Sequence, residues 1–255
     1  MNKEIRTKEI YRQLKNSEFI TIEKLAEKFN VSEMTIRRDL LELEQKGLAV
    51  RGIGGAYPSR ALDVEISIDE KKVKNINKKR QIAEGAINFI KEDMTVFLDS
   101  GSTCYELSKK IKLRDFRHLN VITQDLSIVN YLKETSGINL IVLGGLLSNE
   151  TNSMNGILTQ LCLERLSADI AFLGASSISN DLKIFTPSEN KILSKIEMVK
   201  NSKKSILIAD SGKINNSNLY YVHDVKDFDL FITDQGLSSE FEKRLMESEI
   251  KYMKV

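Results

Sequence analysis

Six short polar loops in the C-terminal two thirds of the chain carry residue types that bind phosphate and sugar hydroxyl groups. Each loop directly follows a short apolar run. The loops are Asp99–Thr103, Thr123–Asp125, Gly144–Gly145, Gly174–Ser177, Asp210–Lys213 and Thr233–Asp234. A Ser-Gly-Ser-Thr sequence that leads into a helix can offer backbone N–H groups, hydroxyls and a helix dipole to a phosphate. One such loop is weak support, because small polar loops are common, but several at one sheet edge indicate a ligand site.

The apolar runs before these loops predict the scaffold. They are rich in Val, Ile, Leu and Phe, and they alternate with segments of helical period. The runs are Thr95–Leu98, Asn120–Ile122, Leu140–Leu143, Ile170–Leu173, Ile206–Ala209 and Leu230–Ile232. Uninterrupted apolar strands separated by helices indicate a parallel sheet covered on both faces. Ligands of such sheets bind in the crevice at the carboxyl ends of the strands, where the loops lie.

A second group of residues with a chemical role lies between Val31 and Gly47. Ser32 can cap a helix start with its hydroxyl, and Gly47 supplies a stop. An apolar stripe at helical spacing consists of Ile36, Leu40 and Leu43, and it leaves Thr35, Arg38 and Glu42 on the other side with Arg37 on the flank. A shorter helix precedes it, with Thr21 as N-cap and Ile22, Leu25, Ala26 and Phe29 as its apolar face.

Two helices on a tight turn, the second with an exposed basic face, are typical of helix-turn-helix proteins that read the DNA major groove. Residues 3–15 predict a supporting helix with Ile5, Tyr11 and Leu14 broadly on one side and Ile10 near them. The glycine-broken β run from Leu48 to Tyr57 predicts a wing that carries Arg51. Helical periodicity alone leaves open a three-helix bundle with a charged, solvated face.

Within this unit, the residue types suggest how DNA would be contacted. Ser32, Glu33 and Thr35 at the helix start are expected to point at bases. Arg37, Arg38 and Arg51 are expected to contact phosphates or guanine edges. The partner expected from this pattern is a double-stranded operator, bound by a dimer or tetramer with one recognition helix per half-site.

Several N-terminal strings combine in a specific way. They are Leu25-Ala26, Val31-Ser32, Thr35-Ile36-Arg37-Arg38-Asp39-Leu40, Leu43-Glu44, Gly47 and Arg51-Gly52-Ile53-Gly54-Gly55-Ala56. Together they resemble the DeoR family of bacterial sugar-metabolism regulators. Ile53 departs from the pattern, since the family often has His at this position of the wing.

The resemblance continues through the C-terminal part, at Leu98–Thr103, Val121–Thr123, Leu143–Gly145 with Gly156, Lys195, and Asp210 with Lys213. It implies a domain related to sugar-phosphate isomerases that binds a phosphorylated sugar as effector, with no cofactor. Gln124 stands where the family usually has Asn, and Lys71 replaces an Arg and lacks its bidentate fork. The effector residues that the loops and the resemblance together select are Lys79, Asp99, Ser100, Gly101, Ser102, Thr103, Thr123, Gln124, Gly144, Gly145, Lys195, Asp210 and Lys213.

Alternatives remain open for individual residues. Asp99 either binds a ligand hydroxyl or only accepts hydrogen bonds that close its loop. Thr103 is a helix N-cap, a phosphate ligand or both, and Lys195 and Lys213 are either ligands or ordinary exposed lysines. Cys104 is either a small packed residue or a redox sensor.

Charge and cysteine content limit the class of protein. The chain has 255 residues and a net charge of +2, and residues 1–60 carry 12 Lys/Arg against 9 Asp/Glu. The basic excess at one end is expected when only that end meets phosphate. Two distant cysteines form no metal or disulfide pattern, and no signal peptide or long apolar run is present, so a cytoplasmic location without membrane contact is expected.

The expected organisation has three parts: a winged helix-turn-helix at 1–57, a linker and connecting helix at 58–81, and an effector domain at 82–255. The basic run between Lys71 and Arg80 is either a solvated helix face or a supplementary contact to the DNA backbone. The predicted function is a DNA-binding regulator, most simply a repressor of a sugar operon. The alternative is a sugar-phosphate isomerase or deaminase with an accessory domain, although no cluster of Asp, Glu and His marks a general base.

Overall fold

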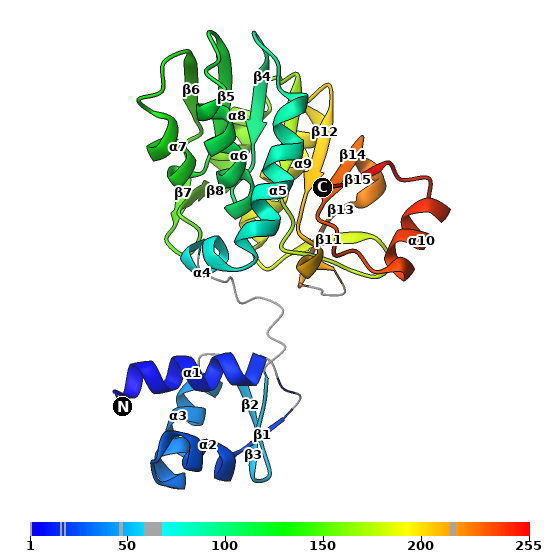
Figure 1. Cartoon of the computed structure of the whole chain (residues 1–255). Helices are drawn as coiled ribbons and strands as arrows, with labels where there is room; N and C mark the ends of the chain where they lie inside the picture. Colours follow the sequence, from blue (N-terminus) through cyan, green and yellow to red (C-terminus); the bar gives the residue numbers. More distant parts are fainter. Residues whose placement is uncertain (1, 16, 18, 46–47, 59–67, 215–217) are drawn as a thin grey trace. The chain divides into compact units, whose positions relative to one another are not determined.

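The computed structural model describes residues 2–15, 17, 19–45, 48–58, 68–214 and 218–255. The chain divides into two compact units, Met1–Val64 and Glu65–Val255 (Figure 1). The expected linker starts at Pro58, the last residue of β3, and its part from 59 to 67 lies outside the described residues. Gly47, the expected helix stop, also lies outside them.

The N-terminal unit is a helical bundle with a small antiparallel sheet. Its elements are α1 (Lys3–Lys15), β1 (Ile20–Thr21), α2 (Ile22–Phe29), α3 (Glu33–Gln45), β2 (Ala49–Gly52) and β3 (Gly55–Pro58). The strands pair in the order β1-β3-β2, with β2 and β3 as the hairpin. This arrangement is a winged helix-turn-helix, as the sequence predicts.

Helix starts and apolar stripes explain the fold of this unit. The hydroxyl of Thr21 accepts a hydrogen bond from the backbone N–H of Lys24 at 3.2 Å and caps α2. The predicted stripe on α3 is buried, together with Ile10 and Leu14 of α1. The prediction that Ile5 lies on the same side of the helix as Leu14 is wrong, because Ile5 is 60% exposed. Ile10 and Leu14 are four residues apart and share a helix face, whereas Ile5 lies five residues before Ile10 and points elsewhere.

A buried ion pair joins α1 to the recognition helix. The guanidinium of Arg6 donates from Nε to Oδ2 of Asp39 at 2.6 Å and from Nη2 to Oδ1 at 3.3 Å. Both side chains are more than nine-tenths buried. Because each charge has its partner, this contact fixes how α3 rests on α1 without leaving an unpaired buried charge.

The C-terminal unit contains one large sheet, two small sheets and seven α-helices within the described residues. Its helices are α4 (Ile68–Val73), α5 (Ile76–Ala86), α6 (Ser102–Leu113), α7 (Leu126–Leu132), α8 (Ile157–Leu163), α9 (Ile192–Lys200) and α10 (Ser239–Glu247). The large sheet has the strands β4 (Thr95–Leu98), β5 (Leu119–Thr123), β6 (Ile138–Val142), β9 (Ile170–Leu173), β12 (Ser205–Ile208), β14 (Leu230–Thr233) and β15 (Tyr252–Lys254).

All neighbours in the large sheet pair in parallel, in the order β15-β14-β12-β9-β4-β5-β6. From β4 the chain builds outward to β5 and β6, and it then returns to β9 on the other side of β4. The strand order therefore reverses between β4 and β9. In an open α/β sheet, the loops at such a reversal diverge and leave a crevice for a ligand.

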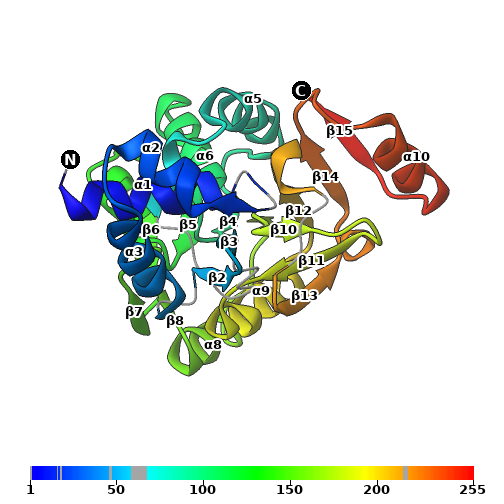
Figure 2. The same ribbon diagram turned by 90° about the horizontal axis from the view of Figure 1, so that it is seen from below.

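Helices cover both faces of this sheet, as the uninterrupted apolar runs predict. Val96 and Leu98 of β4 pack in a core with α5, α6 and α7, while Phe97 between them packs in a core with α8, α9 and α10. Figure 1 shows α5 and α6 in front of the sheet, and Figure 2 shows the same unit along another direction. The α/β fold with a parallel sheet is confirmed.

Short antiparallel strands complete the unit. The hairpin of β7 (Leu146–Ser148) and β8 (Ser153–Asn155) follows β6, and a second small sheet contains β10 (Ser177–Ile178), β11 (Lys183–Thr186) and β13 (Tyr220–Asp224). These strands and β15 were not predicted from the sequence. Among the described residues, no helix is both long and apolar enough to cross a membrane.

Candidate functional site

The start of α3 carries the residues expected to read DNA. The hydroxyl of Ser32 accepts from the backbone N–H of Thr35 at 3.3 Å, and the two hydroxyls lie 3.0 Å apart. Arg37 pairs with Glu33 one turn earlier at 3.3 Å, and the side chain of Arg38 is exposed. Ser32 therefore caps the helix as predicted, and α3 presents an arginine to the solvent.

Arg51 of the wing is held by the same helix. Its Nε donates to Oε2 of Glu44 at 2.6 Å, and its backbone N–H donates to Oε1 of Glu44 at 3.0 Å. Both hydrogen bonds lower the pKa of the Glu44 carboxyl. Glu44 thus links β2 to α3, and Arg51 lies on the wing next to the helix that carries Arg37 and Arg38.

In the C-terminal unit, Asp99 lies where the strand order reverses. It follows β4, and its carboxylate accepts hydrogen bonds from the backbone N–H of Gly174 at 3.1 Å and from Nε2 of Gln124 at 3.4 Å. The ammonium group of Lys195 on α9 also donates to Asp99, and to the carbonyl of Gly174 at 2.8 Å. The carboxylate is buried and joins the loops after β4, β5 and β9.

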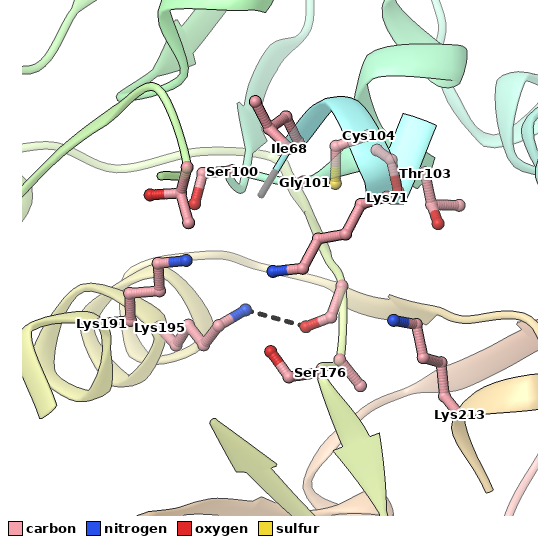
Figure 3. A pocket seen from close by; sticks show the side chains of 14 residues that line it. Ile68, Lys71, Ser100, Gly101, Thr103, Cys104, Ser176, Lys191, Lys195 and Lys213 are labelled. Carbon is pink, nitrogen blue, oxygen red and sulfur yellow. Dashed lines mark hydrogen bonds between the residues drawn. The ribbon is translucent and has the colours of Figure 1, made fainter. Parts of the chain in front are cut away.

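A pocket opens beside this carboxylate, and lysines dominate its charge (Figure 3). The ammonium groups of Lys71, Lys191, Lys195 and Lys213 point toward its centre. They come from α4, the 3-10 turn Glu189–Lys191, α9 and the loop after β12, respectively. The remaining lining residues are Ile68, Ser100, Gly101, Ser102, Thr103, Cys104, Thr151, Gly174, Ala175 and Ser176. Four cationic groups with hydroxyls between them are chemically suited to hold an anion.

The Lys213 side of the pocket contains a buried carboxylate, Asp210. Its Oδ1 accepts from Nδ2 of Asn75 at 2.6 Å and from the backbone N–H of Gly212 at 3.2 Å. Its Oδ2 is buried and has no hydrogen-bond partner among the described residues. Burial lowers the pKa of Lys213 to about 8, although Asp210 opposes this shift. An anion that binds here would favour the charged lysine.

Other buried polar atoms at the same sheet edge also lack partners among the described residues. They include Oγ of Ser100 and Oε1 of Gln124. Buried polar atoms are normally hydrogen-bonded, so orphaned atoms need an explanation such as a bound ligand or water. Their position at the ends of β4 and β5 is where a hydroxyl-rich ligand would supply the missing partners.

Lys79 is placed differently from the other predicted lysines. Its buried ammonium group donates to the backbone carbonyls of Lys71 and Lys74, the latter at 2.5 Å, and burial lowers its pKa. It therefore holds the C-terminal end of α4 and does not line the pocket. Lys72 donates to Ser127, and Lys78 pairs with Asp234 at 3.0 Å. The basic run is thus not simply a solvated helix face, because much of it is bound to its own unit.

The predicted effector residues Thr123, Gly144 and Gly145 do not line the pocket, and they make hydrogen bonds or turns in the loops next to it. Thr123 is buried and accepts from the backbone N–H of Asp125 at 3.1 Å. Asp125 in turn accepts from the backbone N–H of Gly101 at 3.1 Å, and burial raises its pKa to about 6. Gly144 and Gly145 lie between β6 and β7 and do not line the pocket. Gly144 instead accepts a hydrogen bond from Thr159 of α8 at 2.7 Å.

Two profiles of one regulator family match the chain. The DeoR-like helix-turn-helix domain matches residues 6–59, and the DeoR C terminal sensor domain matches residues 74–235. The chain belongs to the DeoR family. It is therefore a DNA-binding transcriptional regulator, and the family assignment made from the sequence is confirmed.

Relatives of this DeoR-family chain are similar over most of their length. The putative aga operon transcriptional repressor of Escherichia coli O157:H7 is 30% identical, over 92% of this chain and 87% of that protein. The lactose phosphotransferase system repressor of Staphylococcus epidermidis is 30% identical, over 95% of this chain and 96% of that protein. These relatives are named as repressors, so the chain stands among regulators and not among enzymes.

Solved structures show a distant likeness in fold. The ribose 5-phosphate isomerase A of Methanocaldococcus jannaschii is 19% identical, with a TM-score of 0.40, over 55% of each chain.

Sequence reasoning missed some residues that line the pocket of this DeoR-family chain, above all Lys191 and Thr151, and it named Ser176 only as part of the loop Gly174–Ser177. Lys191 lies four residues before Lys195, a spacing that brings two lysines to one helix face and could have been noticed. Thr151 lies in the turn of the unpredicted β7–β8 hairpin, and nothing in the sequence marked it as a site residue. Cys104 is fully buried, and burial raises the pKa of its thiol well above the usual value, so it is a packed residue.

Proposed function

We propose that the pocket of the C-terminal unit binds a phosphorylated sugar, and that this ligand modulates operator binding by the N-terminal unit. The observation that carries the proposal is the convergence of four lysine ammonium groups at the strand-order reversal. A phosphate dianion fits their charge, because a compact ammonium group is a good point partner for phosphate oxygens.

The sugar part is proposed from the polar atoms around the phosphate site. Ser100 lines the pocket and its Oγ has no partner among the described residues, so it can pair with a sugar hydroxyl, which is both donor and acceptor, and the hydroxyls of Ser102, Thr103 and Ser176 in the same lining can do so too. The Asp99 carboxylate adds little direct binding capacity, because Lys195 and Gly174 already engage its Oδ2. Asp99 then acts mainly by holding Lys195 in place. Its carboxylate also joins the loops after β5 and β9 through its hydrogen bonds with Gln124 and Gly174.

Ligand contact at Lys71 supplies a route to the DNA-binding unit. Lys71 belongs to α4, the first described element after residues 59–67, and α4 is held by Lys79 and by a hydrogen bond from the backbone N–H of Ile68 to the carbonyl of Glu150 at 2.7 Å. A ligand that draws Lys71 toward the pocket shifts α4 and thereby the start of the connection. The ligand then changes operator affinity only to the extent that it binds more tightly to one of two conformations of the protein, the one that binds DNA or the one that does not.

The biological role that follows is repression of an operon for sugar metabolism by a homo-oligomer. Two relatives named as repressors of the aga operon and of a lactose phosphotransferase system support the sugar context. The mobility of a labelled operator on a gel, with and without the sugar phosphate that binds the protein, tests the role. We expect release from the operator by about tenfold or more, since allosteric coupling is typically about 1–3 kcal/mol. Unchanged DNA affinity at saturating ligand would overturn the regulatory part of the proposal.

A further inference from the structure

One segment of the C-terminal unit has almost no charge. From Thr135 to Leu163 the only charged residue is Glu150, in a chain in which 29% of residues are charged. Burial does not explain this composition. β6 lies at the edge of the large sheet and its residues are at most partly buried, and β7 and α8 expose large aliphatic side chains from the same segment.

The exposed side chains form a defined surface. Helix α8 exposes Ile157 (61%), Leu158 (59%) and Leu161 (49%), and the β7 strand exposes Leu146 (70%) and Leu147 (43%). We call these five residues the apolar patch. Residues three and four apart share a helix face, so the α8 members form one stripe, opposite the buried Thr159 and Leu163.

The two parts of the patch are joined. β7 pairs with β8, only Gly156 separates β8 from α8, and Thr159 of α8 donates to the carbonyl of Gly144 just before β7. Figure 2 shows β7, β8 and α8 side by side at the margin of the unit. Successive strand residues point to opposite faces, so only one of Leu146 and Leu147 can lie on the same face as the α8 stripe, which forms the main part of the patch. Large exposed apolar groups gathered in this way on a soluble protein mark interaction sites.

We infer that the apolar patch is the interface with a second copy of this chain. The core of a protein interface is depleted of charge, which matches this segment. A two-fold interface uses the same patch on both subunits, and an uncharged aliphatic surface is complementary to itself without repulsion. The N-terminal unit has one recognition helix, and helix-turn-helix proteins read paired half-sites as dimers.

A membrane surface fits this patch less well than a second copy does. Helices that lie on membranes carry Lys and Arg on the polar face beside their apolar stripe. Helix α8 contains no charged residue, and neither does the β7–β8 hairpin apart from Glu150 at its turn. Attraction to anionic headgroups is therefore missing.

The test is sedimentation equilibrium of the full chain and of three variants. Leu158→Lys places a charge in the apolar patch, and Leu161→Ser makes the patch more polar without adding a charge. Leu113→Lys is the matched control, because Leu113 at the end of α6 is 76% exposed and lies outside the patch. We expect the wild type and Leu113→Lys to dimerise equally. Leu158→Lys should raise the dimer dissociation constant at least about thirtyfold, as for a residue central to an interface, and Leu161→Ser should raise it less.

Cys162 gives a second readout in the unmodified chain. It is exposed and lies four residues after Leu158, on the same side of α8, whereas Cys104 is buried. We expect slow alkylation of Cys162 at concentrations where the wild type is dimeric and fast alkylation in Leu158→Lys, with equal melting temperatures showing that both are folded. A monomeric wild type, or patch variants that dimerise as well as the control, would overturn the inference.

Discussion

Lys195 and Asp99 form a buried ion pair at the strand-order reversal of the sheet, although 96 residues separate them in the sequence. The pair joins α9 to the end of β4, and Lys195 also donates to the carbonyl of Gly174 at the end of β9. One lysine therefore connects the two loops that define the pocket. Its charge is held in place before any ligand arrives, which is the condition for a preorganised anion site.

Lys195→Met should weaken both the fold and the ligand site. Asp99 would be left as a buried charge without its cation, at a cost of about 3–5 kcal/mol in the free energy of unfolding. Urea unfolding of the full chain measures this effect. Lys200→Met is the control on the same helix, since Lys200 is 65% exposed and its pair with Glu197 is a surface pair worth about 0–1 kcal/mol. Equal stability of both variants would show that the buried pair is not needed.

The affinity for phosphate should depend on the protonation of Lys213. Its pKa is lowered to about 8, and a bound anion favours the charged form, so affinity is highest below pH 8 and falls as the pH rises through 8. The slope should not exceed about tenfold per pH unit for one group. Inorganic phosphate loses its second proton near neutral pH, so its own titration affects the wild type and Lys213→Met alike and cancels when the two are compared.

Calorimetric titration with inorganic phosphate between pH 7 and 9.5 measures this dependence. Lys213→Met should bind more weakly at pH 7 and should lose most of the decline above pH 8. A wild type whose affinity is constant across this range would mean that Lys213 does not contact the anion.

Arg38→Ala should relax the sequence preference of DNA binding. Arg38 is exposed on α3, and loss of a bidentate contact from arginine to guanine costs about 1–3 kcal/mol of discrimination. Competition between operator and unrelated DNA measures the preference. Arg12→Ala on α1 is the control, because Arg12 is 74% exposed and pairs only with Glu9 of its own helix among the described residues. If Arg38→Ala weakened binding to both DNAs equally, Arg38 would be a phosphate contact.

Gly145 and Gly144 should respond differently to alanine. Gly145 has φ +154°, and an added Cβ would lie 2.3 Å from Oγ1 of Thr159 and 2.6 Å from the carbonyl of Asn155. Gly145→Ala is therefore expected to destabilise the fold by at least about 1–3 kcal/mol, whereas Gly144→Ala, with no atom within 4 Å of the added carbon, should stay within about 0.5 kcal/mol. Thermal unfolding compares the two, and similar melting temperatures would contradict the expectation.

The strands of the large sheet were predictable where apolar residues run without interruption. The run Ile170–Leu173 is β9, and Thr95–Leu98 is β4. Strand β15 was not predictable, because Tyr252–Lys254 is only three residues long, follows one lysine and ends in another, and is a strand through its pairing with β14. The β7–β8 hairpin was missed for a similar reason, since it is short and its pattern gives no clear alternation.

The sequence predicted which loops form the site, but it did not predict in which direction each side chain points. Sequence position placed Asp99, Thr103 and Lys213 at the ends of strands, and the pocket is lined by residues from those loops. It could not show that Lys79 turns to the carbonyls of α4, because that depends on a contact made only in the folded unit. The spacing of Lys191 and Lys195 is visible in the sequence, but only the fold shows that both lysines line the pocket.

The central claim is tested most directly by a thermal-shift titration of the full chain with pentose and hexose phosphates, each matched to its free sugar. A ligand at about 100 times its dissociation constant should stabilise the protein by roughly 2.7 kcal/mol. We predict that at least one sugar phosphate raises the melting temperature while its free sugar does not, and that Lys191→Met removes the shift. A shift produced equally by the free sugar, or one that persists in Lys191→Met, would contradict a phosphate site formed by the pocket lysines.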